Sequence, residues 1–238
     1  MSDTNKGGMR LFLTIPNVFT LSNLGFGFLA IYLAVSNELL YAFIAILIAV
    51  LCDGLDGFVA RKMNAANEFG RELDSLCDEV SFGIAPAMML ICSIEDPALK
   101  IYALLAGVIY SAFGALRLAR FNIYGSKEFF EGLAIPAAAF FSGLTILCIV
   151  PMYPQLGIVI IFVTAVLMIT SISFPSTKTK VGVKSVIISL LIGVLYFVVF
   201  SIISLIPDIL RAILWLLFSL KLAYITVSPF VFRKLTKH

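Results

Sequence analysis

The chain has 238 residues, of which 61% are hydrophobic and only 13% charged, with a formal net charge of +3. A soluble domain carries about 25% charged residues, and the mean hydropathy here is +1.07. These values exclude an ordinary soluble domain and favour a polytopic membrane protein. A net charge this small gives no reason to expect a nucleic-acid partner.

Apolar segments follow one another along the chain, separated by turn and breaker residues such as Glu95-Asp96-Pro97. A helix that crosses a bilayer needs about 20 residues. The predicted membrane helices span residues 16–36, 39–62, 71–94, 98–122, 133–150, 155–174, 184–206 and 209–229. The expected fold class is therefore an all-α, polytopic membrane helix bundle with eight spans. Residues 1–15 are expected to lie on the membrane surface as an interfacial segment.

The positive charges predict how these helices cross the membrane. If the N-terminus is cytoplasmic, fourteen of the 17 lysines and arginines fall at cytoplasmic helix ends, as the positive-inside rule requires. We therefore expect both termini in the cytoplasm. The acidic stretch between residues 53 and 78 would then face the cytoplasm.

That stretch holds four aspartates: Asp53, Asp56, Asp74 and Asp78. Spacings of three and four residues put each pair on one helical face. An ionisable group at membrane depth costs about 2.5–3.5 kcal/mol even on the lenient scale, so such groups are usually functional. If a turn near residues 62–69 brings the two faces together, the carboxylates repel one another. A hard divalent cation such as Mg²⁺, Mn²⁺ or Ca²⁺ would relieve the repulsion.

Small residues share the acidic faces. Gly57 follows Asp53 by four residues, Ala60 follows Asp56 by four, and Gly70 precedes Asp74 by four. They leave room for a planar group or a close backbone. Arg61 adds a fork-shaped cation suited to phosphate oxygens.

Polar residues in other helices allow two interpretations. Asn23 and its polar neighbours in the first helix are explained either by hydrogen bonds between helices or by contact with a nucleotide. Arg117 and Arg120, three residues apart, are either snorkelling anchors or a clamp for phosphate or carboxylate groups. The single histidine is the last residue, His238, so a base is expected to be a carboxylate.

The aspartates, the small residues and the arginine of this stretch fit the pattern D-x2-D-G-x2-A-R-x8-G-x3-D-x3-D without a gap. Its eight fixed positions are Asp53, Asp56, Gly57, Ala60, Arg61, Gly70, Asp74 and Asp78. This pattern resembles the signature of the CDP-alcohol phosphotransferases. The run L-R-L-A-R-F-N and the following G-L-x-x-P-A-A-A resemble the serine-using branch, the CDP-diacylglycerol–serine O-phosphatidyltransferases. The resemblance covers about residues 14–145. It implies a six-helix catalytic domain over residues 16–174, with residues 175–238 adding two further helices and a basic tail.

The resemblance also implies a reaction, in which the hydroxyl of L-serine attacks the β-phosphorus of CDP-diacylglycerol or CDP-archaeol and CMP leaves. It assigns roles to the following residues: Asp53, Asp56, Asp74 and Asp78 to two Mg²⁺ or Mn²⁺ ions; Asp78 also to general-base catalysis; Asn23, Asp56, Gly57, Ala60, Arg61 and Gly70 to the nucleotide; and Arg117, Arg120 and Asn122 to the serine carboxylate. A homodimer in the cell membrane is also implied.

Three alternatives stay open at this point. Another enzyme of the same class would use glycerol-3-phosphate or inositol phosphate as acceptor. An ion-coupled transporter would use the aspartates to bind a transported cation. A non-catalytic lipid-binding scaffold would tolerate loss of Asp53.

Overall fold

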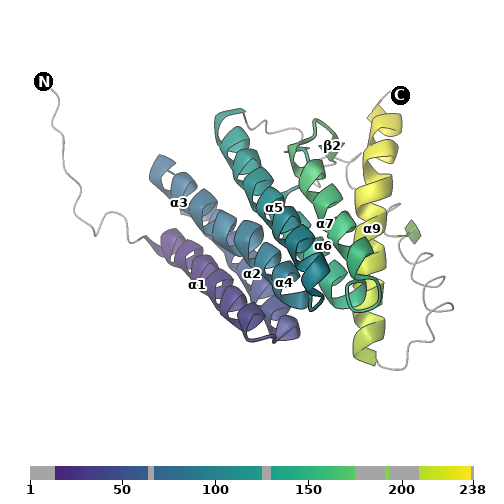
Figure 1. The fold of residues 1–238 in the computed structure, drawn as a ribbon. Coiled ribbons are helices and arrows are strands. Elements are labelled where there is room, and N and C mark those ends of the chain that lie inside the picture. The colour runs from purple at the N-terminus through teal and green to yellow at the C-terminus, as the bar shows by residue number, and fades with distance from the viewer. Residues whose placement is uncertain (1–13, 64–66, 125–129, 175–190, 193–208, 237–238) are drawn as a thin grey trace, which may run out of the picture.

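The computed structural model describes residues 14–63, 67–124, 130–174, 191–192 and 209–236 (Figure 1). Its helices are α1 (Ile15–Val35), α2 (Leu39–Lys62), α3 (Glu68–Asp78), a π-helical turn η2 (Glu79–Ile84), α4 (Ala85–Ser93), α5 (Pro97–Tyr124), α6 (Ile135–Cys148), α7 (Pro154–Ile169) and α9 (Ile209–Thr236). Two short strands, β1 (Phe130–Glu131) and β2 (Ser173–Phe174), pair antiparallel.

The helices lie side by side in one bundle (Figure 1). The hairpin of α1 and α2 forms one edge, and α9 forms the opposite edge next to α6. The continuous helix made of α3, η2 and α4 packs against α1 and α5, and α5 packs against α7. The α1–α2 loop turns tightly at Asn37, whose φ is 61°, a conformation that asparagine tolerates better than most residues.

The prediction of an all-α, multi-pass membrane protein is confirmed. Within the described residues, four helices are long and apolar enough to cross a membrane: α1, α2, the continuous helix Glu68–Ser93, and α5. The helices Ile135–Cys148, Pro154–Ile169 and Ala212–Val227 are apolar but shorter. The span predicted at 184–206 lies outside the described residues except for 191–192, as does most of the surface segment 1–15. The domain boundary at residue 175 remains a prediction.

The third helix begins earlier than the sequence pattern indicated. It was expected from residue 71, but α3 starts at Glu68 because Asn67 caps it. The Asn67 side chain accepts a hydrogen bond from the backbone N–H of Gly70 at 2.7 Å, and the negative charge of Glu68 is favourable in a first turn. Both features were present in the sequence as a helix-start signal.

The same helix widens into a π-helical turn between Glu79 and Ile84. Pro86 lies two residues beyond this turn, and its ring has no N–H to donate and clashes with an ordinary α-helical turn. The wider turn accommodates the proline without ending the helix. One backbone carbonyl in this turn, that of Gly83, accepts a hydrogen bond from Ser111 Oγ on α5 at 3.1 Å.

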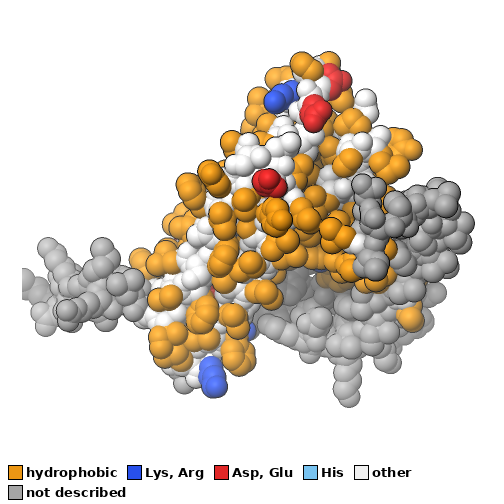
Figure 2. Space-filling model, turned by 90° about the horizontal axis from the view of Figure 1, so that it is seen from below, with side chains coloured by type: hydrophobic (Ala, Val, Ile, Leu, Met, Phe, Trp, Pro, Cys, Tyr) orange, Lys and Arg blue, Asp and Glu red, His pale blue; other side chains and the backbone are white. Residues whose placement is uncertain are grey.

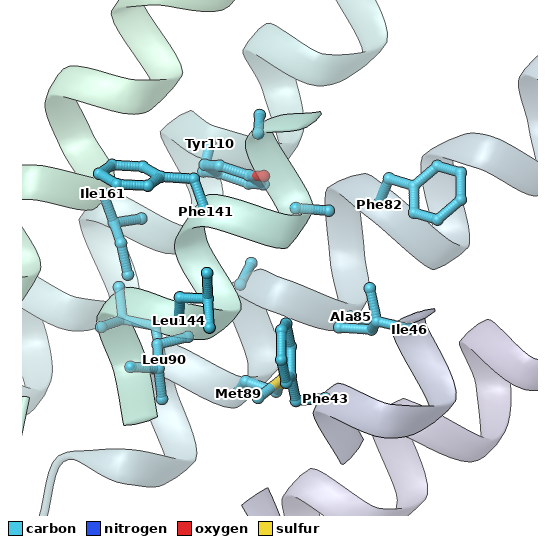
Figure 3. Packing of buried hydrophobic residues seen from close by; sticks show 14 of the residues in the cluster. Phe43, Ile46, Phe82, Ala85, Met89, Leu90, Tyr110, Phe141, Leu144 and Ile161 are labelled. Atoms are coloured by element: carbon cyan, nitrogen blue, oxygen red, sulfur yellow. The ribbon is translucent and has the colours of Figure 1, made fainter. Parts of the chain in front are cut away.

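The core lies where α2, η2, α4, α5, α6 and α7 converge, and aromatic and branched side chains fill it (Figure 3). Phe43 of α2 and Phe82 of η2 are no more than 2% exposed. The ring of Phe43 lies 5.7 Å from that of Phe140 on α6. Tyr110 of α5 is also fully buried in this core.

The outer surface of the bundle is apolar as well. Phe28 of α1 is 68% exposed and Val108 of α5 is 57% exposed. Hydrophobic side chains predominate on the face drawn in Figure 2, with few charges among them. A continuous apolar surface of this extent is unsuited to water, and it fits contact with lipid.

Gly27 sets the distance between α1 and η2, and we predict that a side chain there is destabilising. A Cβ at Gly27 would lie 2.7 Å from the Cα of Ser81, whereas a Cβ at Gly25 would meet nothing within 4 Å. Gly27→Ala should therefore lower the free energy of unfolding by about 1–2 kcal/mol, since overpacking outweighs the gain in helix propensity. Gly25→Ala is the matched control and should leave it unchanged or raise it. Thermal unfolding in detergent measures both, and equal midpoints would contradict the packing assigned to Gly27.

Candidate active site

Three of the four aspartates meet in space. Asp53 and Asp56 come from α2 and Asp74 from α3, and one carboxylate oxygen of each lies within 4.8 Å of the others. Asp56 is only 6% exposed. The Asp74 Oδ1 atom is buried and has no hydrogen-bond partner among the described residues. The structure therefore brings together the two acidic faces that the spacing predicted.

These carboxylates fit a hard divalent cation. Like charges at such short range repel one another strongly where little water is present, and a buried oxygen without a partner is costly. A cation that prefers oxygen ligands would relieve both costs. The donor set contains oxygen alone, which is typical of Mg²⁺, Mn²⁺ or Ca²⁺ sites rather than zinc sites.

Helix α1 supplies hydrogen-bond donors to this acidic cluster. Thr20 Oγ1 donates to Asp56 Oδ2 at 2.7 Å, and Asn23 Nδ2 donates to Asp78 Oδ1 at 2.9 Å. The backbone carbonyl of Asn23 in turn accepts from Ser81 Oγ at 2.9 Å. For Thr20 and Asn23, hydrogen bonding between helices is thus observed.

Asp78 stands apart from the other three aspartates. It is one helical turn beyond Asp74, it is 6% exposed, and it does not share the 4.8 Å cluster. Its nearest described partner is the amide of Asn23. The fourth carboxylate is therefore held separately, next to the cluster but oriented by a neutral donor.

A cavity of about 480 Å³ opens beside the cluster, between α1, α2 and α3. Among the residues predicted to bind a nucleotide, its lining includes Asp56, Gly57, Ala60, Arg61 and Gly70. Asn23 is not among the lining residues, because its side chain points to Asp78.

Other residues from all three helices complete the wall of this cavity. They are Pro16, Asn17, Thr20, Asn67, Glu68, Arg71 and Asp74. Asp56 and Asp74 belong to both the cluster and the wall, so a ligand in the cavity would touch the carboxylates directly.

Arg117 lies on the other side of the cluster. It is 7% exposed on α5, and its Nε is buried without a hydrogen-bond partner among the described residues. Its charge interacts with those of Asp78 and Asp53, and its guanidinium carbon lies 5.8 Å from the ring centroid of Phe121. A buried guanidinium with an unsatisfied donor is suited to an anionic group of a ligand.

Arg120 and Asn122 have local partners instead. Arg120 Nη1 donates to the carbonyl of Ile169 at 3.0 Å, and its Nη2 lies 3.4 Å from the carbonyls of Met168 and Thr170. It thereby caps the C-terminus of α7, a common role for arginine. Asn122 Nδ2 donates to Ser75 Oγ at 3.0 Å and to Glu72 Oε2 at 3.3 Å. Of the three residues predicted to bind serine, Arg117 alone presents a buried donor without a partner in the described part of the chain.

Sequence reasoning did not assign Thr20 or Ser81 a role beside the aspartates. Thr20 orients Asp56, and Ser81 donates to the backbone carbonyl of Asn23. The spacing of Thr20 and Asn23 on one face of α1 was a usable signal, since residues three apart share a face. Ser81 carried no such signal, because its role depends on how closely α1 and η2 approach each other.

The profile of the CDP-alcohol phosphatidyltransferases matches residues 13–224. The chain belongs to this family. The match includes α1 to α7 and most of α9, so the acidic cluster and the cavity both lie inside the family domain.

Similar proteins within the family are named for serine as acceptor. A CDP-diacylglycerol–serine O-phosphatidyltransferase of Methanocaldococcus jannaschii is 36% identical over 78% of this chain and 86% of its own. An archaetidylserine synthase of Methanothermobacter thermautotrophicus is 36% identical over 72% of this chain and 73% of its own. A CDP-diacylglycerol–serine O-phosphatidyltransferase of Bacillus subtilis is 37% identical over 69% and 91%.

We predict that Thr20 positions a metal ligand of this family member. Thr20→Val removes the donor to Asp56 while keeping the side-chain shape, and losing such a supporting hydrogen bond typically weakens metal binding about 10- to 100-fold. Ser22→Ala is the control, because Ser22 donates only to the carbonyl of Val18 in its own helix. Calorimetric titration with Mn²⁺ measures both, and an unchanged affinity in Thr20→Val would refute the positioning role.

Proposed function

We propose that this protein transfers a phosphatidyl or archaetidyl group from a CDP-linked lipid to the hydroxyl of L-serine and releases CMP. The observation that carries the proposal is the acidic cluster of Asp53, Asp56 and Asp74 beside a cavity lined by most of the residues predicted to bind a nucleotide. The serine acceptor is supported by the names of the similar proteins. Both lipid types remain within the proposal, because those names include each.

In this proposal Asp53, Asp56 and Asp74 hold Mg²⁺ or Mn²⁺, with Asp78 as a ligand of a second ion. When bound, the ions neutralise the pyrophosphate and stabilise the charge that develops on leaving CMP. Thr20 fixes the orientation of the Asp56 carboxylate. The cluster thus supplies oxygen ligands that are already in place before the substrate arrives.

The cytidine and its phosphates would occupy the cavity between α1, α2 and α3. Its volume of about 480 Å³ is within the usual range for small-molecule sites. Gly57 and Ala60 line one wall with small side chains and leave space for the ligand. Arg61, at the exposed end of α2, offers a positive charge to phosphate oxygens. The lipid tails would leave the cavity toward the apolar outer surface of the bundle.

Asp78 is proposed as the general base. The serine oxygen forms a bond to the β-phosphorus, the bond from that phosphorus to the CMP oxygen breaks, and the hydroxyl proton moves to Asp78. A serine hydroxyl is a poor nucleophile at neutral pH, so the base must lie within hydrogen-bond reach. Asn23 holds the carboxylate from one side and leaves its other oxygen for the acceptor.

The orientation in the membrane completes the proposal. Both termini and the active site would face the cytoplasm, where the nucleotide product is released, and the membrane would be the cell membrane. A homodimer is also expected, and light scattering of the detergent-solubilised protein measures it.

An acceptor panel tests the function. The purified protein, with Mn²⁺ and either CDP-diacylglycerol or CDP-archaeol, receives labelled serine, glycerol-3-phosphate or inositol phosphate. We expect CMP and a labelled lipid with serine only. Turnover with a phosphorylated acceptor instead would replace serine in the proposal. Cation flux in liposomes without CMP release would favour a transporter.

Asp78→Asn separates catalysis from binding. The amide keeps the size of the side chain but cannot take up a proton, so CMP release should fall by about 10²- to 10⁴-fold, the usual contribution of a general base. Binding of the CDP-lipid in the presence of Mn²⁺, measured by calorimetry, should be largely retained. Normal turnover by this variant would exclude Asp78 as the base.

A further inference from the structure

Glu79 is an acidic side chain at membrane depth that the reaction described above does not use. It directly follows Asp78 and opens the π-helical turn η2. Its Oε2 atom is buried and has no hydrogen-bond partner among the described residues. Intramembrane carboxylates and π-helical turns both occur preferentially at functional sites.

Two glycines make room for the Glu79 carboxylate between η2 and α5. A Cβ at Gly83 would lie 2.5 Å from Glu79 Oε1, and a Cβ at Gly114 would lie 3.1 Å from Oε2. An alanine at position 83 would therefore displace the carboxylate. The two glycines thus leave the space that the Glu79 carboxylate occupies.

Two hydroxyl groups without partners lie beyond this carboxylate. Tyr110 on α5 and Ser142 on α6 are both fully buried. The hydroxyls of Tyr110 and Ser142 approach each other, and the Tyr110 hydroxyl lies within electrostatic range of Glu79, but neither makes a well-formed hydrogen bond among the described residues. Buried polar groups are rarely left unsatisfied, so these oxygens are available as acceptors for a donor that a ligand supplies.

A positively charged side chain, that of Arg117, lies on α5 one helical turn beyond Gly114. Arg117 follows Gly114 by three residues on α5, and its charge interacts with that of Asp78. In the described part of the chain, a guanidinium nitrogen on α5 and a carboxylate oxygen of the residue after Asp78 thus both lack a hydrogen-bond partner close to the proposed base. A neutral alcohol needs neither charge, whereas a zwitterionic amino acid needs both.

We propose that Glu79 binds the ammonium group of the acceptor amino acid, while Arg117 receives its carboxylate. The inference rests on the proposed function and adds the residue that selects a zwitterion. An ammonium group has three N–H donors, and Glu79, Tyr110 and Ser142 offer acceptor oxygens. The same carboxylate would repel acceptors that carry only negative charge, such as glycerol-3-phosphate.

The test compares serine with 3-hydroxypropionate, which keeps the hydroxyl and carboxylate of serine but lacks the ammonium group. The variants are Glu79→Gln and the control Glu95→Gln, which removes the same charge from the exposed loop before α5. The full-length protein in nanodiscs provides the KM for serine, the KM for CDP-diacylglycerol and the inhibition constant of 3-hydroxypropionate against serine.

Glu79→Gln should raise the KM for serine about 10- to 100-fold, the usual loss for one charge-assisted hydrogen bond. The KM for the CDP-lipid and the inhibition constant of 3-hydroxypropionate should change less than about twofold, as should all values in Glu95→Gln. Arg117→Gln should weaken both serine and 3-hydroxypropionate. This pattern depends on which group the ligand carries, and a loss of packing does not produce it.

Parallel losses for serine, 3-hydroxypropionate and the CDP-lipid in Glu79→Gln would overturn the inference and leave Glu79 a structural residue. If Glu79→Gln does not fold, Glu79→Asp keeps the charge on a shorter side chain, and its KM for serine alone should rise. An unchanged KM for serine in Glu79→Asp would also overturn the inference. So would binding of 3-hydroxypropionate to the wild type as tightly as serine. If the wild type releases no CMP with serine, the proposed function fails instead.

Discussion

Repulsion between carboxylates at the end of apolar helices is the constraint on which the other features of this protein depend. One oxygen from each of Asp53, Asp56 and Asp74 lies within 4.8 Å of the others. In water such an arrangement is tolerable, but near apolar helices the same charges interact through a lower dielectric constant. Thr20 of α1 donates a hydrogen bond to Asp56, and a divalent cation would supply the missing positive charge.

Helix α1 has a larger role than its sequence suggests. Its hydroxyl and amide side chains orient Asp56 and Asp78, and one wall of the cavity belongs to it. These contacts require α1 to lie very close to η2, which is possible because Gly27 faces Ser81 without a side chain of its own. The site therefore depends on helix packing at a residue that touches no substrate.

The two arginines of α5 show how similar residues three positions apart acquire different roles. Arg120 reaches the last carbonyls of α7 and ties the end of that helix to α5. Arg117 interacts electrostatically with Asp78 and Asp53 and is buried, and its Nε has no hydrogen-bond partner in the described part of the chain. Because α5 is one long helix from Pro97 to Tyr124, it links the polar end of the bundle to the core around Tyr110, where Glu79 also lies. One helix thus carries both Arg117, the residue proposed to contact the acceptor, and contacts that stabilise the fold.

The sequence by itself determined the all-α membrane class and the approximate positions of the described helices, and its spacing predicted that aspartates of α2 and α3 would form one acidic cluster. Hydropathy and helical spacing are local properties, and they do not depend on how distant segments meet. Only the tertiary structure gave Arg117 and Arg120 different surroundings and placed Asn23 against Asp78 rather than in the cavity. It also showed that the buried Oε2 atom of Glu79 has no hydrogen-bond partner among the described residues. Those features arise from the approach of helices that are far apart in the chain, and spacing along one helix carries no information about its neighbours.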